Sequence, residues 1–198
     1  FSREALDYIC KKLKIGNVRV FNSNIPLDLS YLYQLQELDL SEELHFEKRL
    51  PRKTAMLADN RPVFTQVKAK DILLSYPFES ITTSFIRLLE ECAVDPKVVS
   101  IKITLYRLAR NSKVISALCN AAENGKDVTV MIELRARFDE ANNIEWSKIL
   151  QKSGVKVIYG PKEFKAHSKL LLIKRKSTGD KFDYVTQVGT GNYNEKTA

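Results

Sequence analysis

Residues 98–134 read VVSIKITLYRLARNSKVISALCNAAENGKDVTVMIEL, and the organisation of the chain is clearest in this segment. The apolar, β-branched runs at 98–106 and 128–134 predict two strands. Between them, an apolar stripe with helical spacing starts after Ser112, a typical helix N-cap, and stops at Gly125, a typical helix terminator. A strand, a helix and a second strand in this order predict a βαβ unit whose strands are parallel in one sheet.

The alternation of strands and helices continues on both sides of this unit. The pattern predicts a short strand at 72–75, a helix at 81–92, a helix at 144–152, a strand at 155–159, and a hairpin that joins 167–174 to 182–188. Alternating elements of this kind are typical of α/β proteins. We therefore predict a mainly parallel sheet with flanking helices.

The amino-terminal part of the chain has a different pattern. Residues 2–13 and 28–35 predict two short helices, and the pattern then weakens between 42 and 70, where Pro51, Pro62 and clustered charges occur. We expect a domain boundary in this region. Because the chain lacks an initiator Met and stops just after a Gly-rich loop, we also expect it to be a segment of a longer protein.

The composition excludes several classes of protein. With 44% hydrophobic and 28% charged residues the 198-residue chain is expected to be globular, and no apolar run approaches the ~20 residues that span a bilayer. The first residues lack the layout of a signal peptide. Cys10, Cys92 and Cys119 each lie in an apolar helical pattern, which predicts free, buried thiols and a cytoplasmic location. The net charge of +8 indicates an anionic partner.

A basic cluster surrounds one of the chain's two histidines, His167. Between residues 160 and 176, a single acidic residue, Glu163, accompanies Lys162, Lys165, Lys169, Lys174, Arg175 and Lys176. A cluster of this kind is usually a solvated surface. Because His167 and Lys169 are two residues apart on a predicted strand and face the same way, a phosphate site is a second interpretation.

Four segments are expected to meet at one edge of the sheet, because ligands of parallel sheets gather beyond the carboxyl ends of the strands. Arg107 follows strand 98–106, Arg135 and Arg137 follow strand 128–134, His167 begins the strand that returns from the end of 155–159, and strand 182–188 is followed by Gly189, Thr190, Gly191 and Asn192. All four segments carry groups suited to phosphate. Their joint placement favours a phosphate-binding site.

Each of these features also has a purely structural interpretation. Arg107 can pair with Glu133 or Asp139, and the mixed charges of 133–140 can neutralise one another in a loop. The loop 189–192 lacks the Gly-Lys-Ser/Thr of a Walker P-loop. It is therefore either a tight turn or a nest of N–H groups that binds an anion.

Several long stretches resemble bacterial polyphosphate kinases. These are residues 71–77 (DILLSYP), 101–107 (IKITLYR), 123–130 (ENGKDVTV), 133–140 (ELRARFDE) and 189–198 (GTGNYNEKTA). The resemblance implies that residues 54–198 are the first phospholipase D-like catalytic domain of that family, truncated at its C-terminus. Residues 1–53 resemble, more loosely, the end of the preceding helical domain and a linker.

The resemblance implies an enzyme that reversibly transfers the terminal phosphate of ATP to polyphosphate through a phosphohistidine at His167, with Lys169 as a charge beside it. It also implies that Arg107 and Arg137 bind phosphate and are associated with a Mg²⁺ site. Because arginine cannot ligate a metal ion, we expect Mg²⁺ to be held by phosphate oxygens, water or the carboxylates of Glu133 and Asp139.

The family shares its site between two related domains, and an amino-terminal domain helps to hold the adenine. Because neither the second catalytic domain nor the nucleotide domain is in this chain, we expect the fragment alone to be inactive. The expected partners are ATP or ADP, polyphosphate, those two domains, and further copies of the chain in a homo-oligomer. The sequence leaves peripheral membrane association open.

Two other functions remain as alternatives. A phosphodiesterase of the phospholipase D type would carry an Asp five residues after Lys169, where this chain has Lys174, and this departure favours the kinase. The second alternative is a module that binds polyanions without catalysis. Nucleic acid is not expected as the partner, because exposed aromatic residues interleaved with the basic ones are missing from the sequence.

Overall fold

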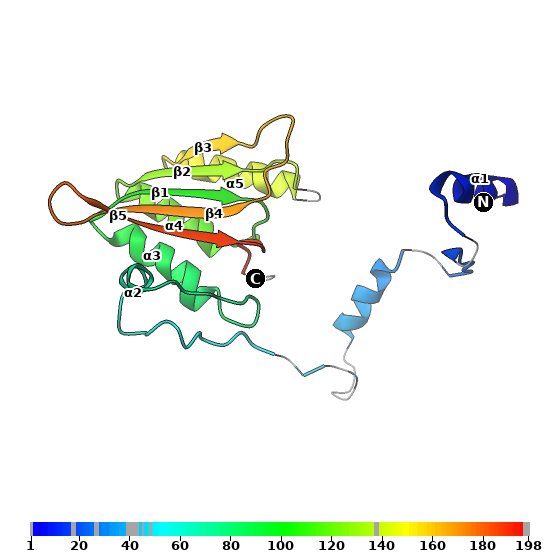
Figure 1. Cartoon of the computed structure of the whole chain (residues 1–198), viewed down its shortest axis with the longest axis horizontal. Helices are drawn as coiled ribbons and strands as arrows, with labels where there is room; N and C mark the ends of the chain where they lie inside the picture. Colours follow the sequence, from blue (N-terminus) through cyan, green and yellow to red (C-terminus); the bar gives the residue numbers. More distant parts are fainter. Residues whose placement is uncertain are drawn as a thin grey trace. The chain divides into compact units, whose positions relative to one another are not determined.

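The computed structural model, drawn in Figure 1, describes residues 2–16, 19–25, 28–38, 44, 46–47, 49–136 and 139–195. The chain forms two compact units, residues 1–48 and residues 49–198. Within the described part of the chain, no helix combines the length and the apolar character needed to cross a bilayer.

The first unit contains short helices. Helix α1 (Arg3–Leu13) begins at Ser2, whose Oγ accepts a hydrogen bond from the Ala5 N–H at 3.2 Å, and it ends at Lys14 in the left-handed conformation. A 3-10 helix, η2, spans Ser30–Glu37. The predicted helix at 2–13 is thus confirmed, whereas the one predicted at 28–35 takes the tighter 3-10 form.

The second unit contains the sheet and the helices around it. Its elements are α2 (Val63–Ala69), a π-helical turn η4 (Thr82–Ile86), α3 (Arg87–Val94), β1 (Val98–Leu105), α4 (Lys113–Glu123), β2 (Asp127–Ile132), α5 (Glu140–Lys152), β3 (Lys156–Tyr159), β4 (Lys169–Lys176) and β5 (Phe182–Gly189). The predicted α/β class is confirmed. Its order of strands and helices from residue 81 onward is also as predicted.

Two local predictions upstream of the sheet were wrong. Residues 72–75 form no strand. Ser75 instead begins a turn, in which its N–H donates to the Glu79 carboxylate at 2.6 Å and the Glu79 N–H donates to the Ser75 carbonyl at 2.8 Å. Helix α2 lies where no element was predicted. It has only 7 residues, too few to display a helical period.

The five strands form one mixed sheet in the order β3-β2-β1-β4-β5. β1, β2 and β3 are parallel, while β4 is antiparallel to β1 and β5 is antiparallel to β4. The predicted hairpin of the last two strands supplies the antiparallel half. β1 is therefore the central strand, with a parallel neighbour on one side and an antiparallel neighbour on the other.

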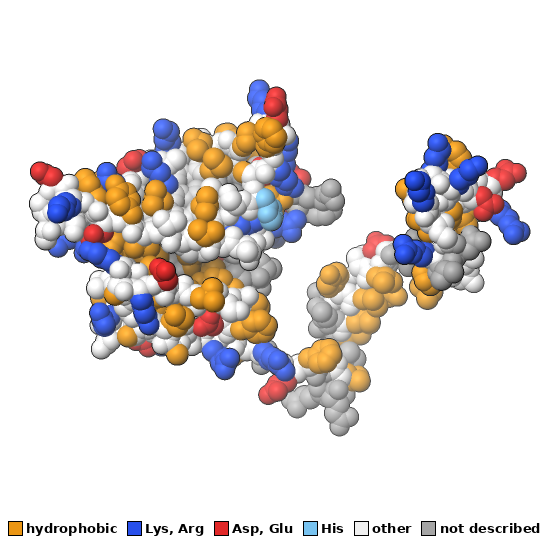
Figure 2. Space-filling view, in the orientation of Figure 1, with side chains coloured by type: hydrophobic (Ala, Val, Ile, Leu, Met, Phe, Trp, Pro, Cys, Tyr) orange, Lys and Arg blue, Asp and Glu red, His pale blue; other side chains and the backbone are white. Residues whose placement is uncertain are grey.

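One face of the sheet forms the hydrophobic core. Ile101 and Ile103 of β1 are buried there with Val130 of β2 and Leu171 of β4, and Figure 1 shows α4 and α5 behind the strands. Side chains on the opposite face are more exposed; Leu170, for example, is 40% exposed. Figure 2, in the same orientation, shows hydrophobic side chains among polar ones over the strands.

Each of the five strands has one end near the site, and these five ends lie along one side of the sheet, which we call the rim. The rim comprises the carboxyl ends of β1, β2, β3 and β5 and the first residues of β4. Two observations place them together: the register pairs Lys169 with Gly189, and the Glu133 N–H donates to the Leu105 carbonyl at 3.1 Å. The segments that sequence patterns bring to one edge do meet there.

Residues 49–53 associate with the second unit. The Arg52 N–H donates to the Phe78 carbonyl at 2.8 Å, and the Ser80 N–H donates to the Arg52 carbonyl at 2.7 Å. These bonds form an isolated bridge between Arg52 and Glu79. The boundary between the units therefore falls a few residues before the domain boundary predicted after residue 53, and the assignment of each unit to a family domain stays a prediction.

All three cysteines are free. Cys92 in α3 is 1% exposed, and burial, reinforced by the negative charges of Asp95 and Glu91, raises the pKa of its thiol to about 12. Cys10 and Cys119 are only partly buried. The predicted absence of a disulfide is confirmed, and full burial holds for Cys92.

The amino end of helix α4 is capped from a distant part of the chain. The Ser112 side chain makes no capping hydrogen bond. Instead, Oε1 of Glu195 accepts hydrogen bonds from the N–H groups of Lys113 at 2.5 Å and Val114 at 3.3 Å. Ser112 thus occupies the N-cap position as predicted, but the capping acceptor is a carboxylate that follows β5 and suits the positive end of the helix dipole.

We expect Glu195→Ala to lower the free energy of unfolding by about 1 kcal/mol, because α4 loses its capping acceptor. Glu195→Gln should cost less, since it keeps an oxygen acceptor and loses only the charge. Ser112→Ala is the control and should cost less than Glu195→Ala. Urea denaturation followed by circular dichroism measures all three, and a larger loss from Ser112→Ala would restore Ser112 as the cap.

Candidate functional site

The ring of Tyr106, directly after β1, lies at the centre of the rim. The imidazole of His167 meets it edge to face, with 4.9 Å between ring centroids and 75° between ring planes. Three cationic groups also lie near this ring: Lys169 Nζ at 4.9 Å, Lys165 Nζ at 5.3 Å and Arg107 Cζ at 6.0 Å from its centroid. The π-face of an aromatic ring is electronegative, so Tyr106 gathers positive charge around the imidazole.

His167 is exposed, at the end of the loop that leads from β3 to β4. The pale blue side chain in Figure 2 lies on the surface near blue Lys and Arg side chains. Its imidazole is therefore accessible to a ligand in solvent. The structure places it with Lys169 and Arg107, as the sequence suggests.

Lys169 is almost completely buried, with 2% of its surface exposed. Its Nζ donates a hydrogen bond to the His167 carbonyl at 2.6 Å, and among the described residues no carboxylate lies within ion-pair distance. Burial lowers the pKa of Lys169. The ammonium group is thus fixed beneath the histidine backbone, whereas the imidazole projects outward.

Arg107 pairs with Asp139. The Arg107 Nε lies 3.1 Å from Oδ2 of Asp139, and the two side chains are 42% and 31% exposed. Of the two carboxylates that sequence patterns offer to Arg107, the structure selects Asp139. Arg137, the second predicted phosphate-binding arginine, lies outside the described residues.

Glu133 is buried and uses both carboxylate oxygens within the protein. Oε1 accepts a hydrogen bond from the Arg135 N–H at 2.8 Å, and Oε2 accepts one from the Ala166 N–H at 2.7 Å. Because Asp139 pairs with Arg107, neither predicted carboxylate is left for a metal ion. The described residues contain no group of three or more His, Cys, Asp and Glu side chains that could hold a metal. They do not fit a protein-held Mg²⁺.

The loop 189–192 leaves the rim beside Lys169. Gly189 pairs with Lys169 at the end of β5, Thr190 and Gly191 are exposed, and Asn192 is half-buried. Neither glycine has a positive φ, so the left-handed conformation that helps to form many anion nests is absent here. The role of this loop in phosphate binding stays a prediction.

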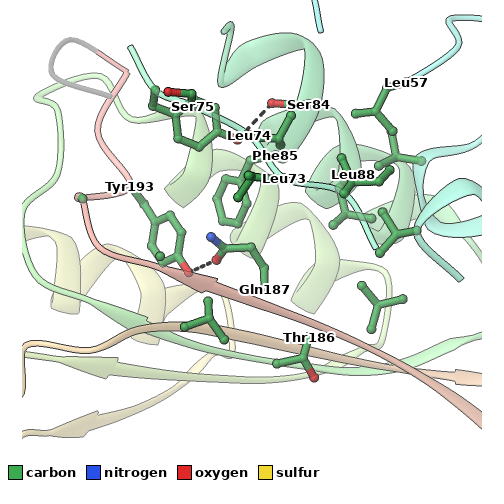
Figure 3. A pocket seen from close by; sticks show the side chains of 18 of the residues that line it. Leu57, Leu73, Leu74, Ser75, Ser84, Phe85, Leu88, Thr186, Gln187 and Tyr193 are labelled. Carbon is green, nitrogen blue, oxygen red and sulfur yellow. Dashed lines mark hydrogen bonds between the residues drawn. The ribbon is translucent and has the colours of Figure 1, made fainter. Parts of the chain in front are cut away.

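Tyr193 anchors the end of this loop. Its ring stacks on Phe85 with 4.4 Å between centroids, and its hydroxyl donates to the Gln187 side chain. Figure 3 shows this bond at the border of a cavity of about 470 Å³ between β5, α3 and residues 72–76. None of the residues that line the cavity is charged. The cavity lining therefore supplies no cation, whereas Lys165, Lys169 and Arg107 lie at the rim around Tyr106.

The basic cluster between 160 and 176 is divided by the length of β4. Lys165 and Lys169 lie at the rim, but Lys174, Arg175 and Lys176 lie at the opposite end of the strand, about 20 Å away at ~3.3 Å per residue. Arg175 there forms an ion pair with Asp95 at 2.7 Å. The far group is therefore separated from His167 by the length of the strand, and a role of these lysines in holding a polyanionic chain stays a prediction.

Two residues that contact the site, Tyr106 and Glu133, were not predicted in the positions that the structure gives them. Tyr106 follows a strand and precedes Arg107, and an aromatic residue at a strand end is most often structural. Glu133 belongs to a run of mixed charges that resembles a salt-bridged loop. The only available signal was position: both residues directly follow parallel strands, at the edge where ligands gather.

Residues 62–198 match the family described as polyphosphate kinase C-terminal domain 1. The chain is 43% identical over 195 residues to a polyphosphate kinase of Rhodopirellula baltica, which covers 98% of this chain and 23% of that protein. It is 41% identical over 201 residues to a polyphosphate kinase of Streptomyces coelicolor, with 99% and 27% covered.

Two solved structures are also similar. The crystal structure of polyphosphate kinase from Porphyromonas gingivalis matches with a TM-score of 0.68 and 32% identity, over 96% of this chain and 31% of that one. Nuc, a phospholipase D family member from Salmonella typhimurium, matches with a TM-score of only 0.37 and 18% identity over 51% of this chain.

The α/β sheet and the match over residues 62–198 define a polyphosphate kinase C-terminal domain. The chain belongs to the polyphosphate kinase family. It spans about a quarter of the length of the curated relatives it matches, 23% and 27% of the two named above.

We expect Lys169→Met to raise the free energy of unfolding by about 1 kcal/mol at neutral pH, because it removes a buried charge that lacks an ion pair. Since the pKa of Lys169 is lowered in the folded chain, the unfolded chain binds more protons between that pKa and the ordinary value near ~10.4. The free energy of unfolding of the wild-type protein therefore rises as pH rises through this interval, and the difference in this free energy between Lys169→Met and the wild type should become smaller.

Lys165→Met, which alters an exposed lysine of the same rim, is the control and should change stability by no more than about 0.5 kcal/mol. Thermal and urea denaturation at several pH values measure both variants. If Lys169→Met destabilised the fold, the hydrogen bond to the His167 carbonyl would outweigh the cost of burying the ammonium group.

Proposed function

We propose that this chain is part of an ATP–polyphosphate phosphotransferase in which His167 carries the transferred phosphoryl group. The observation that carries the proposal is an exposed imidazole held against Tyr106 among Lys165, Lys169 and Arg107. Family membership supports the identity of the substrates. The relatives are named polyphosphate kinases, so ATP or ADP and polyphosphate are the proposed substrates of the full-length protein.

In the proposed first step, a neutral imidazole nitrogen of His167 bonds to the γ-phosphorus of ATP. The bond from this phosphorus to the oxygen that bridges it to the β-phosphate breaks, and ADP leaves. A terminal oxygen of polyphosphate then bonds to the same phosphorus while the nitrogen–phosphorus bond breaks. The polyphosphate becomes one phosphate longer, and the imidazole returns to its neutral form. Each step is reversible.

The protein's part in both steps is mainly electrostatic. Negative charge in a phosphoryl transition state spreads over the equatorial oxygens, and fixed cations stabilise it most when they need no reorganisation. Lys169 meets this condition, because it is buried and hydrogen-bonded beneath His167. Arg107, which Asp139 orients, is proposed to bind phosphate oxygens through its guanidinium group. Arg137 and the loop 189–192 are proposed as further phosphate contacts.

Other parts of the proposal concern the complete protein. Any Mg²⁺ that takes part is proposed to be coordinated by phosphate oxygens and water, since the described residues do not fit a metal site. The second catalytic domain and the nucleotide domain are proposed to lie in the rest of the full-length chain. A homo-oligomer in the cytoplasm, with or without peripheral contact to a membrane, completes the proposal.

A phosphodiesterase of the phospholipase D type is the second candidate function. A histidine just before a strand and a lysine at the start of that strand also suit attack on a phosphodiester. The Lys174 side chain, at the position where that family would carry Asp, lies over the ring of Phe182 at 3.8 Å, far along β4 from His167. This placement favours the kinase, because no acidic partner takes that position.

We expect His167→Ala in the full-length protein to abolish acid-labile ³²P labelling from [γ-³²P]ATP, because the acceptor nitrogen is removed. Labelling of the wild-type protein should be chased by unlabelled polyphosphate. Glu163→Ala, an exposed change in the same loop, is the control and should retain labelling. Labelling that survives His167→Ala would refute the assignment, and hydrolysis of a diester without labelling from ATP would favour the phosphodiesterase.

We expect Lys165→Ala to weaken binding of a short polyphosphate by about fivefold, because a cation near His167 is lost, and to reduce the dependence of affinity on salt. Lys176→Ala, which removes the same charge from the far end of β4, should change the affinity much less. Titration calorimetry with the full-length protein at two salt concentrations measures both. Equal losses in the two variants would indicate that only net charge matters.

A further inference from the structure

One buried carboxylate lies against both ends of the loop between β3 and β4 and is hydrogen-bonded to the second end. Glu133 directly follows β2 and is 4% exposed. Its Oε2 accepts the Ala166 N–H at 2.7 Å, and Ala166 is the residue before His167. At the other end of the loop, a Cβ on Gly160 would lie 2.8 Å from the same oxygen. The loop begins with glycine where the carboxylate fills the space of a side chain.

The carboxylate is stabilised by backbone groups instead of by a cation. Its second oxygen, Oε1, accepts the Arg135 N–H at 2.8 Å. Among the described residues no Lys or Arg forms an ion pair with Glu133. A charged group that is buried at this cost and bonded to two N–H groups has little freedom to move or to exchange partners. Such an arrangement suits a fixed support for the loop better than a metal ligand.

The same support reaches Tyr106 through Asn143. Asn143 of α5 is fully buried, and its Nδ2 donates to the Tyr106 carbonyl at 2.8 Å and to the Glu133 carbonyl at 3.0 Å. The Asn143 amide therefore connects Tyr106, whose ring contacts the His167 imidazole, to Glu133, whose carboxylate binds the backbone N–H of Ala166. The imidazole of His167 is set between these two positions.

We propose that Glu133 is a positioning residue: its carboxylate fixes the end of the loop 160–166 so that the His167 imidazole stands against Tyr106 in a conformation ready for attack. The expected effect on phosphoryl transfer rests on the proposed function, whereas the role of Glu133 in positioning the loop is independent of it. Attack on phosphorus requires a nucleophile held within narrow limits of distance and angle, so release of the loop should slow transfer without removing any reacting group.

The test is a double-mutant cycle in the full-length protein. Glu133→Ala removes the carboxylate, and Gly160→Ala places a methyl group against it, so each should break the bond to the Ala166 N–H. We expect each single variant to slow His167 labelling by at least about tenfold, with the KM for ATP little changed. In the Glu133→Ala background the collision is absent, and Gly160→Ala should add nothing further.

Two measurements follow the loop without reference to catalysis. Hydrogen exchange at the Ala166 amide should become at least about tenfold faster in both single variants, and the nuclear Overhauser contact between the His167 and Tyr106 rings should weaken. Glu163→Ala is the matched control, an exposed acidic residue of the same loop, and should change neither. Gly160→Ala leaves the buried carboxylate in place and carries the test if Glu133→Ala does not fold.

Each outcome decides the proposal. Unchanged exchange at Ala166 in Gly160→Ala overturns it, and so does faster exchange with normal labelling of His167. Additive losses in the double variant also overturn it, because they show that the two residues act through different contacts. If wild-type protein is never labelled at His167, the proposed function fails, and the ring contact and the exchange rates still decide the positioning role.

Discussion

The site depends on one constraint, that β1 has a parallel neighbour on one side and an antiparallel neighbour on the other. β2 runs parallel to β1 on one side, and β4 runs antiparallel on the other. The end of β1 and the beginning of β4 must therefore lie at the same edge of the sheet. Tyr106 and His167, which are far apart in sequence, meet for this reason. Thr104 reinforces the junction, because its hydroxyl bonds to the backbone on both sides of Lys169.

The rim combines buried charges with exposed ones, and the two kinds do different work. Lys169 and Glu133 are buried and bond to backbone groups near His167, so their positions are well determined. Lys165 and the His167 imidazole are exposed and free to meet a ligand. Burial of an ammonium group and a carboxylate costs stability, and apolar side chains of similar size at these positions would often give a fold at least as stable. Their presence at this edge is best explained by the site that they support.

Local patterns predicted the elements well and their partners poorly. The helix after Ser112 was correctly located, yet its cap comes from Glu195, because any residue type that accepts a hydrogen bond can serve if the fold brings it there. The basic residues after Gly160 were recognised as a cluster around His167, yet Lys176 lies at the opposite end of β4 from His167. Hydrophobic periodicity reports which face is buried, and it is silent about which distant polar groups meet.

The amino-acid sequence was sufficient for the α/β class, the order of the strands and helices from residue 81 onward, the edge at which the polar loops gather, and the resemblance that family comparison bears out. These follow from periodicity, from turn residues and from the handedness of βαβ units, all of which act over short distances. Only the tertiary structure assigned Tyr106, Glu133 and Gly160 to their places around His167. Their contacts join the ends of different strands, and the close packing that selects them exists only once the whole sheet has formed.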